Sequence, residues 1–381
     1  MSKNCKVAVF LANLTVGGAE RVTINLAKGL ADRGHEVDLV VARGEGKLVS
    51  DVPSSVNLVE LKIGRAPGIG ILGAVPELVS YLRHQRPAAI ISSLTHTNVA
   101  AITAMVVSGI ETTSIVIEHL NPGTAVLSTR KRLGFELATR LYPLADEIVA
   151  VSDGVASGVA SLVDIPKDDF TVIENPVVTE DLLTESKTDI DCPWFRDDET
   201  DVIISLGRLS TQKDIPTLID AFDQLEDDGV RLGVVGQGDK FESIQADISE
   251  RGLTERVWLP GYVENPFRYI QAADAFVLSS KREGLPTVLI EALACGCPVV
   301  STDCPSGPAE VLNHGEYGSL VPVGRPDILA DAIRETLDDP AHPDHLRSRA
   351  EEFTVDAAAE RYERLFCSPV DSGHRLVSSQ S

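Results

Sequence analysis

The feature that most limits the fold is an alternation of short apolar runs with stretches of helical spacing. In the first half, runs typical of buried strands alternate with helical segments, the first of which is predicted from about Ala19 to Arg33. The predicted strands are Lys6–Asn13, Glu36–Ala42, Ala88–Leu94, Thr113–Glu118 and Glu147–Ser152, and the segment Phe170–Val178 follows them. Strands that alternate with helices predict a parallel sheet that is covered by helices.

The alternation stops in an acidic stretch, Thr179–Thr200, and then starts again. The second set of predicted strands is Val202–Leu206, Arg231–Val235, Arg256–Leu259, Ala275–Leu278 and Pro298–Ser301, and helices are predicted at Asp327–Leu337 and Ala350–Phe366. A chain of 381 residues can bury two cores. We therefore predict two doubly wound α/β domains, at 1–178 and 201–349, with an interdomain linker at 179–200 and a tail at 367–381.

Two glutamates eight residues apart lie at the start of a predicted helix of the second domain. Glu283 precedes a Gly284-Leu285-Pro286 turn, and Glu291 lies between one and two turns into the apolar helical run that follows. Pro suits the first helical position. Carboxylates accept hydrogen bonds from sugar and ribose hydroxyls, whereas the helix N-terminus attracts anions. The spacing favours a polyol beside a phosphate; the alternative is one glutamate that pairs with the helix dipole and one that is solvated.

Basic side chains follow the first strand of the same domain. Arg208 and Lys213 lie in the loop after Val202–Leu206, and ligands of open α/β sheets bind at the carboxyl ends of strands. Arg and Lys both bind phosphate oxygens. The alternative is a pair of ordinary surface cations.

These motifs together resemble the family-4 retaining glycosyltransferases of the GT-B fold. The resemblance covers roughly residues 5–366. It rests on Gly17-Gly18-Ala19-Glu20, on Gly207-Arg208 with Lys213, and on Glu283-Gly284-Leu285-Pro286 with Glu291 and the following Ala292–Val300. The stretch Cys304–Glu310 resembles a subset that builds cell-surface polysaccharides and lipid-linked oligosaccharides.

The resemblance implies two Rossmann-like domains that face a central cleft, with the last helix packed back on the first domain. It implies transfer of a hexose or N-acetylhexosamine from a nucleotide sugar to a glycan or lipid-linked acceptor, with retention at the anomeric carbon. Arg208 and Lys213 would bind the diphosphate, Glu291 the ribose, and Glu283 the donor sugar, beside Gly284, Leu285 and Pro286. The catalytic candidates are Glu283 and His119.

The first domain offers three further candidates. Gly17 and Gly18 follow a strand and open a helix, which allows a close backbone approach to the donor or makes a tight turn. His119 follows an apolar strand, as a histidine near the donor or acceptor does in the resembling enzymes, although a structural histidine is equally compatible. A polar cluster after another strand, Ser93, His96 and Asn98, fits acceptor contact or a helix cap.

No metal site is expected. Asp189-Ile190-Asp191 matches an Asp-x-Asp pair that holds metal in another glycosyltransferase fold, but it lies in the acidic linker and not at a strand end. Arg208 and Lys213 would replace a metal by stabilising the departing diphosphate. The six cysteines have no paired zinc spacing and are expected to be reduced thiols.

The net charge of −23 disfavours binding to nucleic acid and suggests a halophilic source, where salt screens the repulsion; the alternative is an ordinary acidic protein. One segment, Val126–Leu144, is basic, with Arg130, Lys131, Arg132 and Arg140, and its Leu133, Leu137, Leu141 and Leu144 recur at helical spacing. This pattern predicts an amphipathic helix that contacts anionic lipid or packs on the domain surface. No signal peptide or membrane-spanning run is expected, so we predict a cytoplasmic enzyme that is peripheral on the membrane.

Two other functions fit the same motifs. Nucleotide-sugar 2-epimerases share the architecture, and they need no acceptor. A catalytically silent subunit could bind a nucleotide sugar, although the intact Arg208, Lys213, Glu283 and Glu291 argue against loss of activity.

Overall fold

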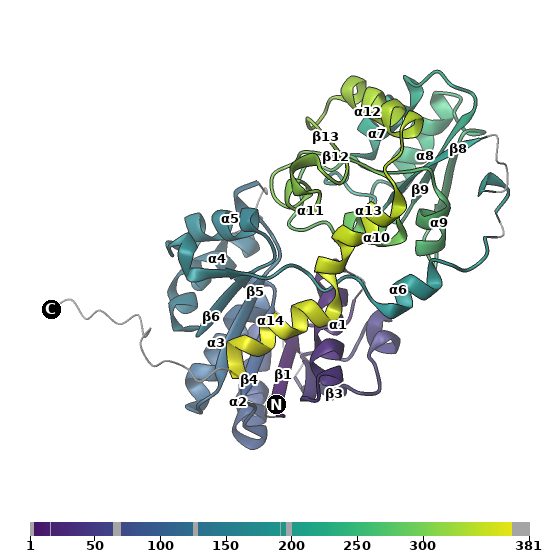
Figure 1. Ribbon diagram of the computed structural model, residues 1–381. Coiled ribbons are helices and arrows are strands. Elements are labelled where there is room, and N and C mark those ends of the chain that lie inside the picture. The colour runs from purple at the N-terminus through teal and green to yellow at the C-terminus, as the bar shows by residue number, and fades with distance from the viewer. Residues whose placement is uncertain are drawn as a thin grey trace. The chain divides into compact units, whose positions relative to one another are not determined.

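The computed structural model describes residues 4–15, 17–63, 70–124, 129–190, 192–195 and 200–367 (Figure 1). The chain divides into two compact units. The first unit comprises Met1–Pro176 together with Val355–Ser381, and the second unit comprises Val177–Thr354. The chain therefore enters the second unit after Pro176 and returns to the first unit at Val355.

The first unit is built on a parallel sheet in the order β3-β2-β1-β4-β5-β6-β7. Its strands are β1 Lys6–Leu11, β2 Glu36–Val41, β3 Asn57–Glu60, β4 Ala89–Ser93, β5 Thr113–Glu118, β6 Glu147–Ala150 and β7 Phe170–Val172. Its α-helices are α1 Gly18–Asp32, α2 Val75–Gln85, α3 Thr95–Ser108, α4 Thr129–Leu141, α5 Asp153–Val163 and α14 Val355–Cys367. The short helix η4 Tyr142–Leu144 follows α4 directly.

The second unit has a parallel sheet in the order β10-β9-β8-β11-β12-β13. Its strands are β8 Asp201–Leu206, β9 Val230–Val235, β10 Val257–Gly261, β11 Ala275–Leu278, β12 Val299–Thr302 and β13 Ser319–Val321. Its α-helices are α6 Glu180–Glu185, α7 Ile215–Asp223, α8 Phe241–Glu250, α9 Phe267–Ala272, α10 Thr287–Cys295, α11 Pro308–Val311, α12 Pro326–Asp338 and α13 Pro343–Ala350.

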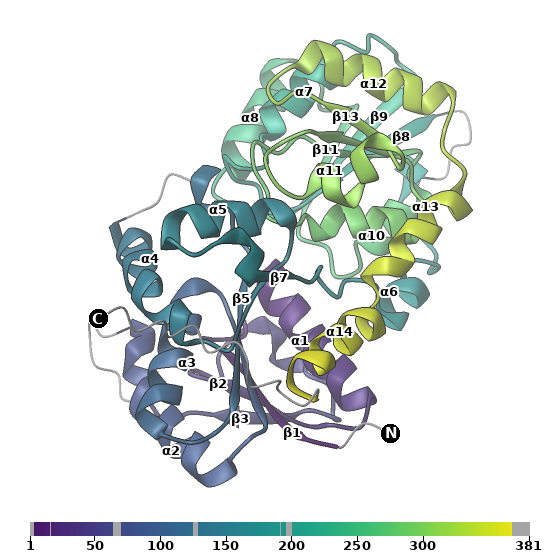
Figure 2. The same ribbon diagram turned by 60° about the vertical axis from the view of Figure 1, so that its left-hand side comes forward.

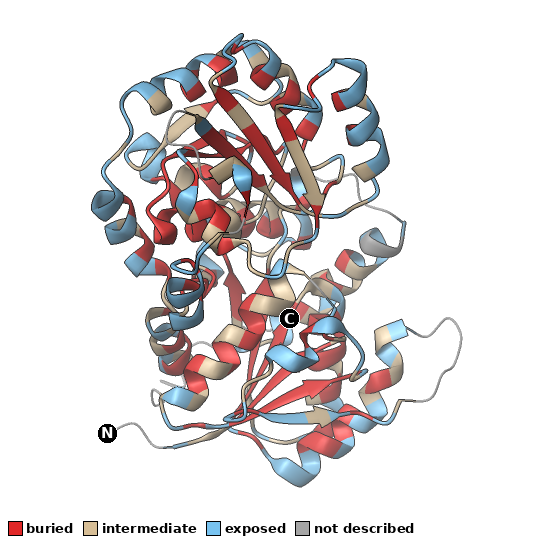
Figure 3. Cartoon of the chain, turned by 90° about the vertical axis from the view of Figure 1, so that its right-hand side faces the viewer, coloured by how far each residue is buried: buried red, intermediate tan, exposed pale blue. Residues whose placement is uncertain are grey.

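The central strands of both sheets are almost completely buried (Figure 3). Strands β1, β4 and β5 of the first unit and β8, β11 and β12 of the second are near-continuous apolar runs, as expected for parallel strands with helices on both faces (Figure 2). Of these six strands, β5 and β11 have the bounds that the sequence predicts, and the bounds of the other four differ from the prediction by one or two residues.

Helix α14 lies beside α1, although the two are far apart in the sequence (Figures 1 and 2). The contact is close because α1 has Gly29 there: a Cβ on Gly29 would lie 2.6 Å from Val355 Cγ1 and 3.0 Å from the Cβ of Ala359. Arg33, the C-cap of α1, adds ion pairs to Asp356 at 2.7 Å and to Glu363 at 2.8 Å. The last helix therefore belongs to the first unit.

The structure differs from the sequence prediction at the junctions. The predicted helix Ala350–Phe366 is two helices, because α13 ends at Ala350 and extended backbone at Thr354 precedes α14. The stretch 179–200, predicted as a linker, groups with the second unit and contains α6, whose N-cap Thr179 accepts a hydrogen bond from the Leu182 N–H. The sequence did not predict the short outer strands β3 and β13.

Candidate functional site

The candidate donor site lies where the strand order of the second unit reverses. Strand β8 pairs with β9 on one side and with β11 on the other, so the loops after β8 and β11 diverge from neighbouring strand ends. Such a switch point is where open α/β sheets bind their ligands. The two loops carry most of the residues that the sequence predicts for donor binding.

Lys213 and Glu283 meet between these two loops. Lys213 Nζ lies 2.7 Å from Glu283 Oε1, and the side chains are only 15% and 9% exposed. The hydroxyl of Ser280 donates to the same oxygen at 2.7 Å, and the amide of Gln212 approaches Glu283 Oε2 at 3.4 Å. A cation and a carboxylate are thus held together in a sheltered place at the strand ends.

The same loops are fastened to each other by a second set of bonds. The Lys281 N–H donates to the Gln212 carbonyl at 2.8 Å, and the Ser279 hydroxyl donates to the Lys213 carbonyl at 2.9 Å. Lys281 Nζ also pairs with Asp214 Oδ1 at 2.7 Å. The sequence analysis did not predict Ser280, Gln212 or this second ion pair. The run of polar residues between the buried strand β11 and Glu283 could have indicated that this loop belongs to the site.

The turn after Glu283 is packed tightly against the loop that precedes α11. A Cβ on Gly307 would lie 2.5 Å from Pro286 Cδ and 2.7 Å from the Gly284 carbonyl oxygen, and Gly307 has a φ of +88°. Glycine fits both the close approach and the left-handed backbone. Pro286 is the N-cap of α10 and not its first helical residue, a shift of one position from the prediction.

Arg208 and Glu291 lie on the elements that flank the Lys213–Glu283 pair. Arg208 is exposed, one residue after Gly207 at the end of β8. Glu291 is buried in α10, the helix that starts just after the Glu283 loop. Lys213 and Glu283 are therefore in direct contact with each other. Arg208 lies in the same loop as Lys213, and Glu291 lies in the helix that follows the Glu283 loop.

In the first unit, a hydrogen-bonded chain joins α1 to His119. Thr23 of α1 lies with Oγ1 3.0 Å from Ser93 Oγ, and Ser93 Oγ lies 2.7 Å from His119 Nε2. Strand β4, which ends at Ser93, is the neighbour of β1, so this chain is at the switch point of the first sheet. Burial lowers the pKa of His119 to about 4, so its imidazole is neutral at pH 7.

Gly17 is the N-cap of α1, and Gly18 is its first residue. The backbone of Gly17 is extended, with φ −163°, so its conformation does not require glycine. A Cβ there would instead meet Glu20 Oε2 at 2.2 Å. The missing side chain thus makes room for the Glu20 carboxylate at the start of α1.

Asn98 belongs to a buried polar network and is not positioned for acceptor contact. It is fully buried, accepts from the Ser92 hydroxyl at 2.8 Å, and donates to the Ile117 carbonyl at 2.9 Å. Its side chain also approaches Glu118, which accepts hydrogen bonds from Tyr142 and Thr95. The acceptor hypothesis is therefore wrong for Asn98; His96 is exposed on the same helix.

Burial dominates the titration of this network. It raises the pKa of the Glu118 carboxyl to about 7, and the hydrogen bonds from Tyr142, Thr95 and Asn98 act in the opposite direction. The pKa of Tyr142 is also raised, first by burial and then by Glu118. Glu118 directly precedes His119, so the network fixes the strand end that carries the histidine.

The basic segment forms α4 and η4, with an unexpected buried face. Phe135, Ala138 and Tyr142 are buried, whereas Leu133 is 56% and Leu144 is 50% exposed. The leucine stripe that the sequence predicted is therefore not the packed side of the helix. The side chains of Arg132 and Arg140 are exposed; those of Arg130 and Lys131 lie outside the described residues.

Among the described residues, one group of at least three His, Cys, Asp or Glu has ligand atoms close enough to hold a metal ion, namely Cys5, His35 and Cys367 of the first unit. Asp189 is exposed, and Asp191 lies outside the described residues. Within the described part of the chain, no helix combines the length and the hydropathy that a bilayer span requires.

Comparison with known proteins identifies the family. A family described as "Glycosyltransferase Family 4" matches residues 16–181, and one described as "Glycosyl transferases group 1" matches residues 186–353. The chain is a family-4 glycosyltransferase of the GT-B fold. The predicted family, the fold class of two parallel-sheet α/β domains and the assignment as a transferase are thereby confirmed.

Two curated relatives align with nearly the whole glycosyltransferase. One is the N-acetylgalactosamine-N,N'-diacetylbacillosaminyl-diphospho-undecaprenol 4-alpha-N-acetylgalactosaminyltransferase of Campylobacter jejuni, 28% identical over 91% of this chain and 95% of the relative. The other is the lipopolysaccharide core biosynthesis glycosyltransferase LpsE of Rhizobium meliloti, 27% identical over 92% and 96%. Anabaena Alr3699/HepE, solved with UDP and glucose, has a TM-score of 0.78 at 20% identity, covering 96% of this chain and 100% of its own.

Proposed function

We propose that this glycosyltransferase moves a hexose or N-acetylhexosamine from a nucleoside-diphosphate sugar to a lipid-linked glycan or polysaccharide acceptor, with retention at the anomeric carbon. The observation that carries the proposal is the sheltered Lys213–Glu283 pair at the switch point of the second unit. The printed names of the two curated relatives support the acceptor class, because one acts on a diphospho-undecaprenol glycan and the other in lipopolysaccharide core synthesis.

The proposed donor exchanges partners with the ion pair. A phosphate oxygen of the donor accepts from Lys213, and the sugar hydroxyls donate to the Glu283 carboxylate that Lys213 releases. Because both side chains are already sheltered, their interactions with the donor are strong compared with the same contacts in water. Arg208 contributes the second positive charge on the diphosphate, and Glu291 accepts from the ribose.

His119, the Thr23–Ser93 chain and the Gly17-Gly18 turn form the contribution of the first unit in this proposal. A neutral imidazole can donate one hydrogen bond and accept another without adding charge. With Nε2 engaged by Ser93, Nδ1 is the atom with which His119 would contact a sugar hydroxyl.

The proposal is tested by supplying the purified enzyme with a panel of nucleotide sugars and lipid-phosphate or lipid-diphosphate acceptors. Mass spectrometry should find one acceptor that gains a hexose or N-acetylhexosamine, and NMR of the product should show the anomeric configuration of the donor. A changed donor sugar that forms without any acceptor would identify an epimerase instead, and inversion at the anomeric carbon would contradict retention.

Arg208→Ala should weaken binding of the nucleoside diphosphate. Loss of a charge-assisted contact costs about 1.5–3 kcal/mol, which is about a 10- to 150-fold increase in Kd. Isothermal calorimetry with the wild-type protein measures the reference affinity. Arg334→Ala, which removes a half-exposed arginine of α12, is the matched control and should leave Kd unchanged. Equal affinities of the Arg208 variant and the wild type would contradict its role.

Activity should not require a divalent metal. If Lys213 and Arg208 neutralise the diphosphate, dialysis against millimolar chelator should leave the initial rate nearly intact. Enzyme assayed with added magnesium or manganese gives the comparison. A rate abolished by chelator and restored by manganese would reverse this prediction and return attention to Asp189 and Asp191.

We also propose that α4 touches the membrane that carries the acceptor. Its exposed Arg132, Leu133, Arg140 and the nearby Leu144 combine positive charge with apolar side chains, in a protein whose net charge of −23 otherwise repels anionic lipid. Arg130 and Lys131 belong to the same proposed contact. Each cation near an anionic surface contributes about 1 kcal/mol at low ionic strength.

The double variant Arg132→Ser with Arg140→Ser should therefore sediment with anionic liposomes much less than the wild type, by about 30-fold in partition coefficient at low salt. The control double variant Lys47→Ser with Lys62→Ser removes two other exposed cations of the first unit and should behave as wild type. Equal binding by the Arg132/Arg140 variant and the wild type would assign α4 a purely structural role.

A further inference from the structure

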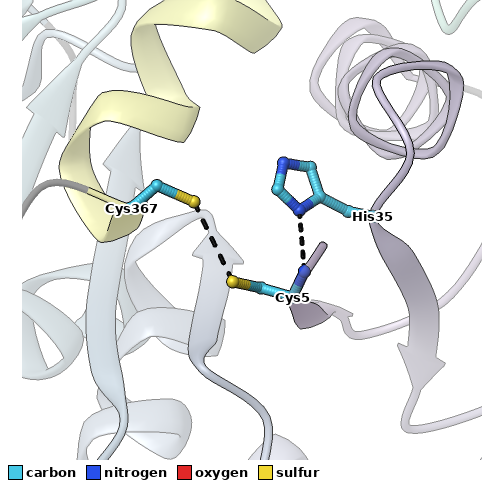
Figure 4. A group of neighbouring side chains, drawn as sticks. All are labelled: Cys5, His35 and Cys367. Atoms are coloured by element: carbon cyan, nitrogen blue, oxygen red, sulfur yellow. Dashed lines mark hydrogen bonds between the residues drawn. The ribbon is translucent and has the colours of Figure 1, made fainter. Parts of the chain in front are cut away.

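Two cysteines from opposite ends of the chain face each other in the first unit. Cys5 precedes β1, and Cys367 is the last residue of α14. Their Sγ atoms lie 4.0 Å apart, and Figure 4 shows the two side chains pointing toward each other. All six cysteines of the sequence lie within the described residues, and only these two are partly exposed, whereas Cys192, Cys295, Cys297 and Cys304 are buried.

His35 lies beside this pair. Its Nδ1 accepts a hydrogen bond from the Cys5 backbone N–H at 3.3 Å, whereas its buried Nε2 lies 3.3 Å from Glu363 Oε1 without forming a hydrogen bond. The ring also packs edge-on against Phe366 with a centroid distance of 5.3 Å. A metal ion bound through Nδ1 would have to displace the Cys5 N–H, so the geometry favours a reaction between the two sulfurs over a Cys–His–Cys metal site.

We propose that Cys5 and Cys367 form a reversible disulfide that fastens the end of α14 to the start of β1. A disulfide needs an S–S distance of about 2.05 Å, so the two sulfurs must approach each other by about 2 Å from their separation of 4.0 Å. Helix α14 is the segment by which the chain returns from the second unit. The disulfide therefore adds a covalent bond to a helix that is otherwise held by packing on Gly29 and by the Arg33 ion pairs.

The oxidant is a low-molecular-weight disulfide. One cysteine thiolate attacks a sulfur of this oxidant and releases one thiol, which leaves a mixed disulfide on the protein. The thiolate of the other cysteine then attacks the protein sulfur of the mixed disulfide and releases the second thiol. Two protein thiols are oxidised and one disulfide is reduced to two thiols, so electrons and protons balance.

The buried cysteines should react with the oxidant more slowly than Cys5 and Cys367. Burial raises the pKa of Cys295 and of Cys304 to about 12, and that of Cys297 well above its usual value, so these thiols stay protonated. Burial and the adjacent Cys5 raise the pKa of Cys367 to about 11. Its thiolate fraction grows with pH, and oxidation of the pair should be faster at pH 9 than at pH 7.

The test exposes the native, reduced protein at pH 8.5 to glutathione disulfide, quenches with acid and blocks the remaining thiols. Two of the six thiols should no longer react with the blocking reagent. In a sample that is not blocked, the mass of the protein should be lower by two hydrogens. Proteolysis of the oxidised protein should give a cross-linked peptide that contains Cys5 and Cys367. The Cys5→Ser and Cys367→Ser variants should never lose two hydrogens. The matched control Cys192→Ser should still form the disulfide.

Oxidation should also raise the midpoint of thermal unfolding of the wild type by at least about 5 °C, since the bond closes a long loop, and dithiothreitol should reverse the increase. Six thiols that survive, or losses that give only mixed or intermolecular disulfides, would overturn the proposal. Zinc binding would also overturn it. If the reduced wild type retains one equivalent of zinc through dialysis and the Cys367→Ser variant retains none, the cluster is a metal site.

Discussion

Replacing Glu283 by Ala should lower kcat/KM by about 30- to 900-fold, which corresponds to about 2–4 kcal/mol of transition-state stabilisation. The carboxylate is 9% exposed and lies at the strand ends of the switch point. In the proposed complex it is the acceptor for donor sugar hydroxyls, and the contact is made in a sheltered place where water cannot replace it. Rates measured across a range of concentrations of the donor that the nucleotide-sugar panel identifies test this expectation.

Affinity for the nucleoside diphosphate should respond differently from the rate. Removal of Glu283 leaves Lys213, whose side chain is 15% exposed, without its carboxylate partner. A diphosphate then relieves an unpaired sheltered cation, so its Kd should stay the same or decrease while turnover collapses. This opposite response separates a role on the sugar from a role on the phosphates.

Two variants control for damage to the loops. Glu283→Gln keeps the shape and still accepts from the Ser280 hydroxyl, so it should be folded as well as the wild type but nearly as slow as Glu283→Ala. Asp214→Asn breaks the neighbouring Lys281–Asp214 pair and should change kcat/KM less than about fivefold. Turnover of Glu283→Ala within twofold of the wild type would remove Glu283 from the site.

The sequence predicted most reliably what depends on continuous apolar runs. The bounds of β5 and β11 were predicted without error, because both strands are buried on both faces and are followed directly by a polar residue. The edge strand β3 was missed because it is largely exposed and shows no apolar run. Strand position at the centre or the edge of a sheet is a tertiary property that local pattern does not contain.

Helical spacing gave the right element but the wrong face in α4. Leu133, Leu137 and Leu141 recur at four residues, yet Phe135, Ala138 and Tyr142 recur at three or four residues as well, and they are the ones that pack. Periodicity defines the repeat of a helix and not which of two apolar stripes faces the core. The choice depends on the neighbouring helices α3 and α5.

In the candidate site, too, the sequence predicted individual residues but not the contacts that depend on the tertiary fold. Lys213 and Glu283 were predicted separately, and the parallel pairing of β8 with β11 brings them together. The polar network of Asn98, Glu118 and Tyr142 was not predicted, because its members are isolated polar residues in apolar segments. Only the packing of α3 and η4 against β5 assembles them.

That network makes the stability of the first unit depend on pH. Glu118 is 1% exposed, and burial raises its pKa from 4.5 to about 7. Between these values the unfolded chain releases the proton while the folded protein keeps it. The favourable contribution of the protonated carboxyl is therefore complete below pH 4.5 and is lost as the pH rises towards 7, a change of up to about 3 kcal/mol in the free energy of unfolding.

Glu118→Gln should remove this dependence, because an amide stays neutral at every pH. Its oxygen can still accept from Tyr142, and its NH2 group can donate to Thr95 Oγ1, so the network keeps its bonds. The variant should match the wild type near pH 4.5 and exceed its stability by up to about 3 kcal/mol at pH 8, measured by urea unfolding. Thr103→Val is the control: it removes a hydroxyl contact to the Val99 carbonyl within α3, which involves no carboxylate, and should leave the difference between pH 4.5 and pH 8 as in the wild type. If the wild type and Glu118→Gln instead lose or gain stability in parallel between pH 4.5 and pH 8, the carboxyl of Glu118 is already ionised in the folded protein, and Tyr142 with its neighbours stabilises a buried charge.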